Sequence, residues 1–230
     1  MKLSKKKKNI EKLYDKKKLY KLTEAVEALQ GMPKAKFNET VELAMNLNLD
    51  PKSAQAAVRG TAFLPHGTGK TIRVAVFCKA HDAEEAKAAG ADFTGSEDLV
   101  KKVASGWCDF DVAVATNEMM REIAKLGRVL GPRGMMPNPK TGTVTNEVAK
   151  TVKEVKAGKV EFKMDKQAGI HVGVGKISFA KEALCENAKE LLYAIFTASP
   201  SLNKPQTVKS ATLALSMGPG LKIDISEFRK

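Results

Sequence analysis

The sequence predicts two domains of different class, a discontinuous two-layer α+β domain and a Rossmann-like three-layer α/β domain inserted into it. The middle of the chain alternates short β-branched segments with helical segments, which is typical of a parallel sheet covered by helices on both faces. The two ends carry helices and strands in blocks instead. Glycine-rich joints at 67–69 and 157–159 separate the patterns. We therefore expect residues 1–67 plus 160–230 to form the discontinuous domain and residues 68–159 the inserted one, with the joints acting as a hinge.

The first part of the discontinuous domain is expected to hold two helices and a strand. The segment "LTEAVEALQGM" predicts a short helix with Thr23 as its N-cap. The segment "KFNETVELAMNLNLD" (36–50) predicts a second helix, capped by Asn38. The shared face of this second helix consists of Val41, Ala44, Met45 and Asn48. The segment "AAVRGTAFLP" predicts a strand that Pro65 ends.

The inserted domain is expected to alternate strands and helices. Strands are predicted for "TIRVAVF" (71–77) and "FDVAVAT". Helices are predicted for "DAEEAKAAGA", ending at Gly90, "SEDLVKKVASG", from Ser96 to Gly106, "NEMMREIAKLGRVLG", ending at Gly131, and "TNEVAKTVKEVKAG", from Thr145 to Gly158. This order is that of a parallel sheet with helices on both faces.

The last part of the chain returns to the discontinuous domain. The segments "KVEFKMD" and "IHVGVGK" predict two strands, and the "KQAG" between them predicts a hairpin. Residues 181–198 predict a long amphipathic helix. The segments "QTVKSATLALSM" and "LKIDISEF" predict two further strands around a "GPG" turn.

The net charge of the 230 residues is +13, and most of it lies at the N-terminus. Residues 1–21 contain ten lysines against Glu11 and Asp15, a net of +8, so the rest is only mildly basic. This tail favours a nucleic-acid partner over a merely solvated arm. It lacks the apolar face of a membrane-surface helix, and no apolar segment is long enough to span a membrane. The three widely spaced cysteines fit a reduced cytosol better than a disulfide framework.

Enzyme motifs are incomplete in this chain. The segment "HGTGKT" resembles part of a P-loop, but the motif requires a glycine where Leu64 stands, and the segment precedes a strand rather than following one. Asp109 and Asp111 are better explained as polar residues at a strand start than as metal ligands. The three histidines are scattered. No catalytic residue, metal site or cofactor is therefore predicted.

The segment "LGPRGMMPNPKTGTV" (130–144) combines three prolines with glycines and two methionines. It follows a predicted helix and lacks the Gly-Lys-Thr order of a phosphate-binding loop. Two interpretations stay open. It is a stiff connector between two helices, or it is a secondary RNA contact in which Arg133 and Lys140 reach phosphates while Met135 and Met136 supply adaptable apolar surface.

This loop and four other segments resemble the bacterial form of the large-subunit ribosomal protein one (L-one) family. The other segments are "MPKAKFNETVELAMNL" (32–47), "RGTAFLPHGTGKT" (59–71), "AGKVEFKMDKQAGIHVGVGK" (157–176) and "SMGPGLKID" (216–224). The resemblance implies a cytoplasmic protein of the large ribosomal subunit, monomeric within it, that binds 23S rRNA and forms the mobile stalk involved in release of E-site tRNA. It also implies repression of translation by binding to the mRNA of its own operon.

The resemblance further implies an RNA-binding surface on the discontinuous domain. Its residues are Lys36, Phe37, Thr40, Glu42, Lys166, Gly169, His171, Ser210, Ser216, Met217, Gly218 and Pro219. Short polar groups and close-approaching backbone suit the shallow minor groove of an RNA helix. From the residues alone, Phe37 and Met217 would instead be assigned to core packing. Two other functions stay as alternatives: a nucleotide-binding enzyme built on the α/β domain, and a general nucleic-acid chaperone driven by the lysine tail.

Overall fold

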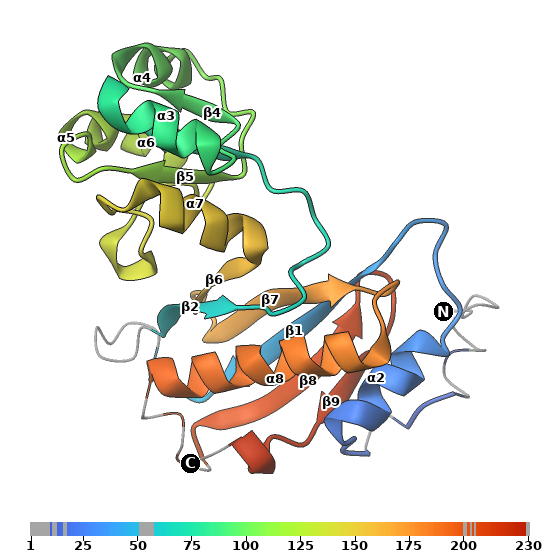
Figure 1. The fold of residues 1–230 in the computed structure, drawn as a ribbon. Helices are drawn as coiled ribbons and strands as arrows, with labels where there is room; N and C mark the ends of the chain where they lie inside the picture. The colour runs from blue at the N-terminus through green and yellow to red at the C-terminus, as the bar shows by residue number, and fades with distance from the viewer. Residues whose placement is uncertain are drawn as a thin grey trace. The chain divides into compact units, whose positions relative to one another are not determined.

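A computed structural model describes residues 10, 13–15, 18–50, 58–199, 202, 204 and 206–228 of the chain. The chain divides into two compact units, one made of Met1–Gly69 with Val160–Lys230 and the other of Lys70–Lys159. Both are mixtures of helices and strands (Figure 1). Since most of the lysine-rich tail lies outside the described residues, its predicted role has no structural counterpart here.

The first unit is built on a four-stranded antiparallel sheet in the order β7-β1-β8-β9. Its strands are β1 (Thr40–Leu47), β7 (Gly169–Lys176), β8 (Val208–Leu215) and β9 (Gly220–Ile223). Helices α2 (Leu22–Gln30) and α8 (Lys181–Ala198) lie across one face of this sheet (Figure 1). The core lies between the sheet and these helices, and it includes Leu43, Leu213 and Leu191. The unit is therefore a two-layer α+β structure.

The segment predicted as a second helix is strand β1, so that prediction was wrong. The burial of its residues alternates strictly, with Val41, Leu43, Met45 and Leu47 inside. Val41 and Met45 are four residues apart, which satisfies a helical spacing as well as a strand spacing. Leu43 and Leu47 decide the question, because an alternation of period two buries all four on one face of a sheet. Asn38, the predicted cap, precedes this strand.

The predicted hairpin around residue 166 also needs correction. Strand β6 (Lys159–Lys163) pairs with β2 (Arg59–Phe63) in a separate two-stranded sheet, whereas β7 pairs with β1. The two strands are joined by a tight turn, but they belong to different sheets.

Helix α8 has the predicted bounds, and α2 begins one residue before the predicted cap Thr23. The helix α8 also fixes the joint after β2, since the side chain of Asn187 bonds the backbone of His66, Gly67 and Val174.

The second unit has three layers around a parallel sheet in the order β4-β3-β5. Its strands are β3 (Val74–Phe77), β4 (Phe93–Gly95) and β5 (Val112–Ala115). Alternate residues of β3 point to opposite faces: Val74 and Val76 pack with α3 (Ala80–Ala88) and α7 (Val148–Ala157). Ala75 and Phe77 pack with α4 (Glu97–Ala104) and the segment that follows β5. The predicted combination of α+β with a three-layer α/β fold is confirmed.

Three local differences separate the second unit from its prediction. The helix expected before Gly131 is broken into α5 (Met120–Ile123), the 3-10 turn η2 (Ala124–Leu126) and α6 (Gly127–Leu130). Helix α7 begins at Val148, and Thr145 accepts a hydrogen bond from the backbone of Glu147 instead of capping the helix directly. The short edge strand β4 was not predicted. Its three residues carry too little pattern to distinguish them from a loop.

Candidate nucleic-acid interface

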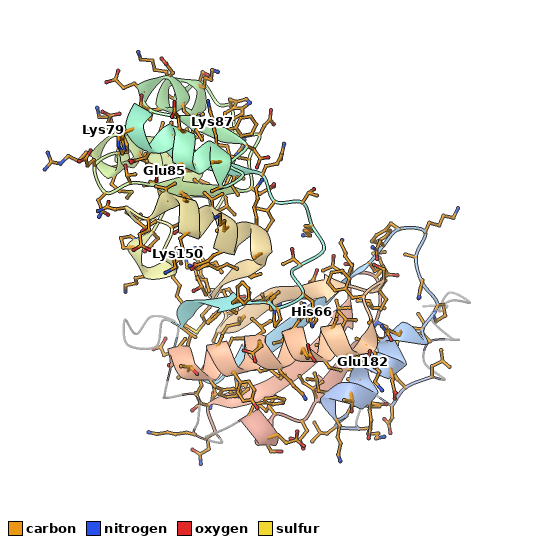
Figure 2. The ribbon with its side chains drawn as sticks, in the orientation of Figure 1. His66, Lys79, Glu85, Lys87, Lys150 and Glu182 are labelled. Atoms are coloured by element: carbon orange, nitrogen blue, oxygen red, sulfur yellow. The ribbon has the colours of Figure 1, made fainter. Side chains whose placement is uncertain are left out.

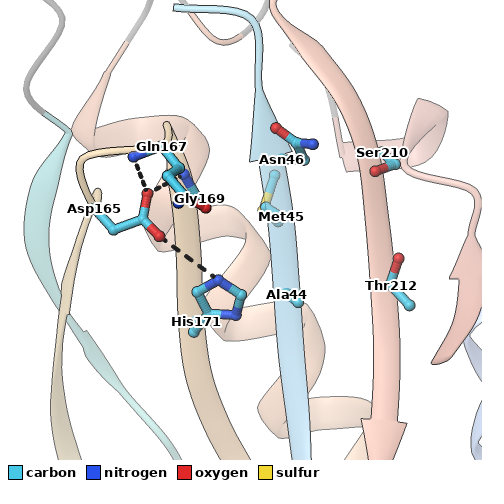
Figure 3. A pocket seen from close by; sticks show the side chains of 9 residues that line it. All are labelled: Ala44, Met45, Asn46, Asp165, Gln167, Gly169, His171, Ser210 and Thr212. Carbon is cyan, nitrogen blue, oxygen red and sulfur yellow. Dashed lines mark hydrogen bonds and ion pairs between the residues drawn. The ribbon is translucent and has the colours of Figure 1, made fainter. Parts of the chain in front are cut away.

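The face of the four-stranded sheet opposite α2 and α8 is lined with small and polar side chains. Their positions follow from the register, which places Ala44 of β1 between His171 of β7 and Thr212 of β8. One step further along, Asn46 lies between Gly169 and Ser210. These residues line a hollow of about 180 Å³ (Figure 3). This face therefore offers hydroxyl, amide and imidazole groups to a ligand.

A turn held by Asp165 borders this hollow. Its Oδ1 accepts hydrogen bonds from the backbone N–H groups of Gln167 and Gly169, at 2.8 and 2.6 Å (Figure 3). These bonds, Gly169 first, followed by the nearby charge of His171, hold the pKa of Asp165 below its ordinary value. A Cβ on Gly169 would lie 3.0 Å from both Asp165 Oδ2 and His171 Nε2, so the turn has little room for a side chain there. Lys166, at the tip of the turn, is exposed.

The end of the sheet joins two further segments, the loop before β1 and the turn after β8. The backbone N–H of Ser216 donates to the carbonyl of Thr40 at 3.1 Å, and the N–H of Thr40 donates to Ser216 Oγ at 3.2 Å. The Lys176 ammonium group donates to Thr40 Oγ1 at 2.9 Å. Both hydroxyls, which the resemblance implies as RNA contacts, therefore also hold these two segments together.

Glu39 connects the same two segments from inside, and no sequence pattern indicated this role. Its side chain is 1% exposed. Its Oε1 accepts from the backbone N–H of Ala35 at 2.6 Å, and its Oε2 accepts from the N–H of Met217 at 3.1 Å. Two backbone N–H groups donate to this buried carboxylate, so it fixes the distance between the loop before β1 and the turn after β8. Glu39 therefore positions the residues on either side of it.

Two large apolar side chains at this end of the sheet face solvent. Phe37 is 55% exposed and Met217 is 66% exposed. The alternative that both residues pack in the core is therefore wrong. Next to Met217, Gly218 closes the turn through an N–H donated to the Leu215 carbonyl, and a Cβ on Gly218 would lie 2.9 Å from the Leu215 Cβ. This turn thus needs glycine for packing reasons and presents its backbone closely to a ligand.

The predicted residues form two groups on the first unit. Those at the end of the sheet are Lys36, Phe37, Thr40, Ser216, Met217, Gly218 and Pro219. Those on or beside the polar face are Glu42, Lys166, Gly169, His171 and Ser210. Strand β1 runs through both groups, and six residues of strand span roughly 20 Å. The predicted residues did not include Asn46 and Thr212, which lie in the same face, because they came from the resemblance and not from the pairing of β1 with β8.

The 130–144 loop of the second unit is fixed largely by its own contacts. Asn138 Oδ1 accepts from the backbone N–H of Lys140 at 2.8 Å, and the N–H of Asn138 donates to Thr143 Oγ1 at 2.8 Å. Met135 and Met136 pack partly against the core of the unit. These contacts agree with the interpretation of the loop as a stiff connector between two helices. Arg133 and Lys140 are exposed, so their contact with RNA stays a prediction.

Metal-ligating side chains do not gather anywhere in the part of the chain that the structure describes. It contains no group of three or more histidine, cysteine, aspartate or glutamate side chains placed to hold a metal ion. A search of the same residues finds no helix with the length and apolarity needed to cross a membrane.

An open sheet face with short polar groups, bordered by exposed lysines and apolar side chains, is the class of surface that suits an RNA helix. Residues 22–219 match the model of the "Ribosomal protein L1p/L10e family". The chain belongs to this family. It is accordingly a protein of the large ribosomal subunit that binds rRNA, associated with the ribosome in the cytoplasm, and families of ribosomal proteins are generally not enzymes.

Proposed function

We propose that the first unit binds a stem of 23S rRNA through the two residue groups described above, forms part of the mobile stalk that helps E-site tRNA leave, and represses translation by binding the mRNA of its own operon. The exposure of Phe37 and Met217 carries this proposal. Two large apolar side chains held in solvent, on segments tied by a buried carboxylate, are what a binding surface requires.

The chemistry of the surface suits an RNA helix. The minor groove of A-form RNA is wide and shallow and displays 2′-hydroxyls, which short polar side chains and backbone groups can reach. Ser210, Thr212 and Asn46 supply such groups from neighbouring strands. Lys36 and Lys166 lie at the two ends of the surface, where phosphates of the same helix would meet them. Glu42 adds an acceptor for a 2′-hydroxyl or a guanine amino group.

Repression follows from using one surface for two RNAs. If the operon mRNA presents the same structure as the rRNA stem, the protein cannot hold both at once. Free rRNA then removes the protein from the mRNA, and a surplus of protein occupies the mRNA and stops its translation. The E-site tRNA role rests on the family. It also requires a hinge at the two joints that connect the predicted domain 1–67 plus 160–230 with the predicted domain 68–159. Arg133 and Lys140 are the proposed secondary contacts to rRNA or tRNA phosphates.

The test is binding of the 23S stem, titrated in salt, by the wild type, Phe37→Ala and Met217→Ala. Each variant should bind about tenfold more weakly, because loss of apolar contact with a nucleotide costs about 1–3 kcal/mol. Phe63→Ala is the matched control, since Phe63 is comparably exposed at 53% but lies on β2, outside the proposed surface. Affinities for the stem that are unchanged in both variants would refute the proposed surface.

Repression is tested with a reporter translated from the operon mRNA leader. The variants should lose repression in proportion to their loss of stem binding. A variant that loses the stem but still represses would show that the mRNA uses another surface.

Deleting residues 1–21 should lower the salt slope, since the lysines release counterions on binding. A slope unchanged by the deletion would remove the tail from the contact.

A further inference from the structure

A second hollow lies in the other unit, at the edge strand β4, where the proposed surface does not reach. Its cavity volume is about 510 Å³, within the range of small-molecule sites. It is bordered by the end of α3, by β4 itself, and by α4 with the residues that follow it. Its lining combines aromatic rings and lysines.

Two aromatic rings form the apolar wall of the hollow. Phe93 and Trp107 meet edge to face, with centroids 4.8 Å apart and planes at 85°. Trp107 is also tilted against Phe110, which is fully buried, at 5.7 Å between centroids. These contacts fix the indole, yet Trp107 remains half-buried and lines the hollow. A flat surface held in one orientation is available to another flat ring.

Two lysines that line the hollow beside these rings, Lys87 and Lys102, form no ion pair within the described residues. Lys79 and Lys87 lie at opposite ends of α3 (Figure 2). Lys79 pairs with Glu118 at 2.6 Å. Lys87 and Lys102 both line the hollow, and both are exposed.

The carboxylate in the hollow does not cancel this charge. Asp92 accepts the backbone N–H of Val74 at 2.8 Å and pairs with Lys156 at 3.1 Å. The Val74 N–H first, and then Lys156, hold the pKa of Asp92 below its ordinary value. Because Asp92 is paired with Lys156, it is not the partner of Lys87 or Lys102.

We propose that this hollow binds one unpaired nucleotide of an RNA, with its base against Trp107 and Phe93 and its phosphate between Lys87 and Lys102. A nucleotide is the ligand whose aromatic and anionic parts match both halves of the lining. An inorganic anion would leave the aromatic wall unused, and an apolar peptide would leave the two ammonium groups unpaired. The inference rests on the proposed RNA-binding function and adds to it a site for single-stranded nucleotides, separate from the helix-binding surface.

Trp107 is the sole tryptophan of the chain, so its fluorescence reports this hollow alone. The full-length protein would be titrated with a single-stranded hexanucleotide, with a free mononucleotide and with inorganic phosphate. We expect saturable quenching by the hexanucleotide, weakened by salt, and quenching by the mononucleotide only at several-fold higher concentration, because the strand presents six nucleotides to the hollow. Inorganic phosphate should have little effect. No quenching by the hexanucleotide overturns the proposal. Tighter binding of the mononucleotide than of the hexanucleotide overturns the assignment to RNA, and equal quenching by phosphate overturns the nucleotide site and leaves an anion site only.

The lysines are tested with two double variants of equal net charge. Lys87→Ala with Lys102→Ala should weaken the hexanucleotide about tenfold at low salt, because two phosphate contacts are lost. Lys125→Ala with Lys153→Ala removes two exposed lysines of the same unit that do not line the hollow, and it should change the affinity less than about twofold. Equal losses in both variants would mean general charge attraction and would overturn the site. Circular dichroism checks that both variants are folded.

The failure of this inference can be told apart from failure of the proposed function. Met217→Ala should weaken the 23S stem without changing the quenching of Trp107 by the hexanucleotide. A wild type that binds the stem but shows no quenching disproves the nucleotide site alone. Quenching that persists in a protein unable to bind the stem disproves the helix-binding surface alone.

Discussion

The antiparallel and the parallel sheet differ in how many of their faces are covered. In β1 of the antiparallel sheet every second residue is buried, and two of the intervening residues, Ala44 and Asn46, line the polar hollow. In β3 of the parallel sheet all four residues are buried, because helices cover both faces. A ligand can therefore lie along the first sheet, whereas in the second unit it can meet only the edges, the strand ends and the loops. The two candidate sites occupy those different places.

The largest effects are expected from placing asparagine at successive positions of the two strands. In β3, Ala75→Asn and Val76→Asn should each cost about 4 kcal/mol, because each buries an amide without partners. In β1, Leu43→Asn should cost as much, but Ala44→Asn less than about 1 kcal/mol. Urea unfolding followed by circular dichroism measures this, with Trp107 fluorescence reporting the inserted unit. If Ala75→Asn were as harmless as Ala44→Asn, the contrast between the sheets would fail.

Glu39→Ala tests whether a buried carboxylate of the first unit contributes more stability than an exposed one. Removing the acceptor of the Ala35 and Met217 N–H groups should cost on the order of 3 kcal/mol of stability. Affinity for the 23S stem should fall more than about tenfold, because Phe37 and Met217 lose their common anchor. Glu42→Ala, three residues further along the chain and exposed on β1, should change stability by less than about 0.5 kcal/mol. Equal stability of both variants would show that Glu39 does not position the segments that carry Phe37 and Met217.

Joining residues 1–67 directly to 160–230 separates the two sheets altogether. The open sheet, its helices and its loops are all contained in this shortened chain, so it should fold and bind the 23S stem within about threefold of the full chain. Circular dichroism and a gel shift measure the two properties. A folded shortened chain that no longer binds would place the main interface in the inserted unit, reversing the comparison.

The smallest effect concerns the Asp165 turn at the open face. Because its pKa is lowered in the folded protein, the carboxylate stabilises the turn fully above the ordinary aspartate value of about 4. This contribution is lost as the pH falls through the lowered pKa and the Gln167 and Gly169 N–H groups lose their acceptor. Amide chemical shifts of these two residues should titrate with a midpoint below 4, and Asp165→Asn should abolish the titration. A midpoint at or above 4 would contradict the hydrogen-bonded turn.

Helix α8 and the alternation of strands and helices in the second unit were predicted well because their patterns are long or repeated. Helix α8 has eighteen residues of consistent periodicity, and its bounds agree with the prediction. Strand β1 was misassigned because Val41 and Met45 fit two periods at once. Glu39 could not be found, since its role depends on Met217, 178 residues away. The RNA-binding residues came only from the resemblance, because lysine, serine and glycine in short loops carry no pattern that identifies their ligand.

The pairing of β1 has a consequence for the order in which the protein folds during its synthesis. Val41 pairs with Gly175 on one side and with Leu215 on the other, whereas the inserted unit is one continuous segment, Lys70–Lys159. The inserted unit can thus fold as soon as it leaves the ribosome that makes it, while β1 waits with both edges unpaired. The turn that carries Met217 arrives last. A nascent chain therefore cannot present the proposed RNA surface until synthesis has passed that turn, which keeps unfinished chains from competing for RNA.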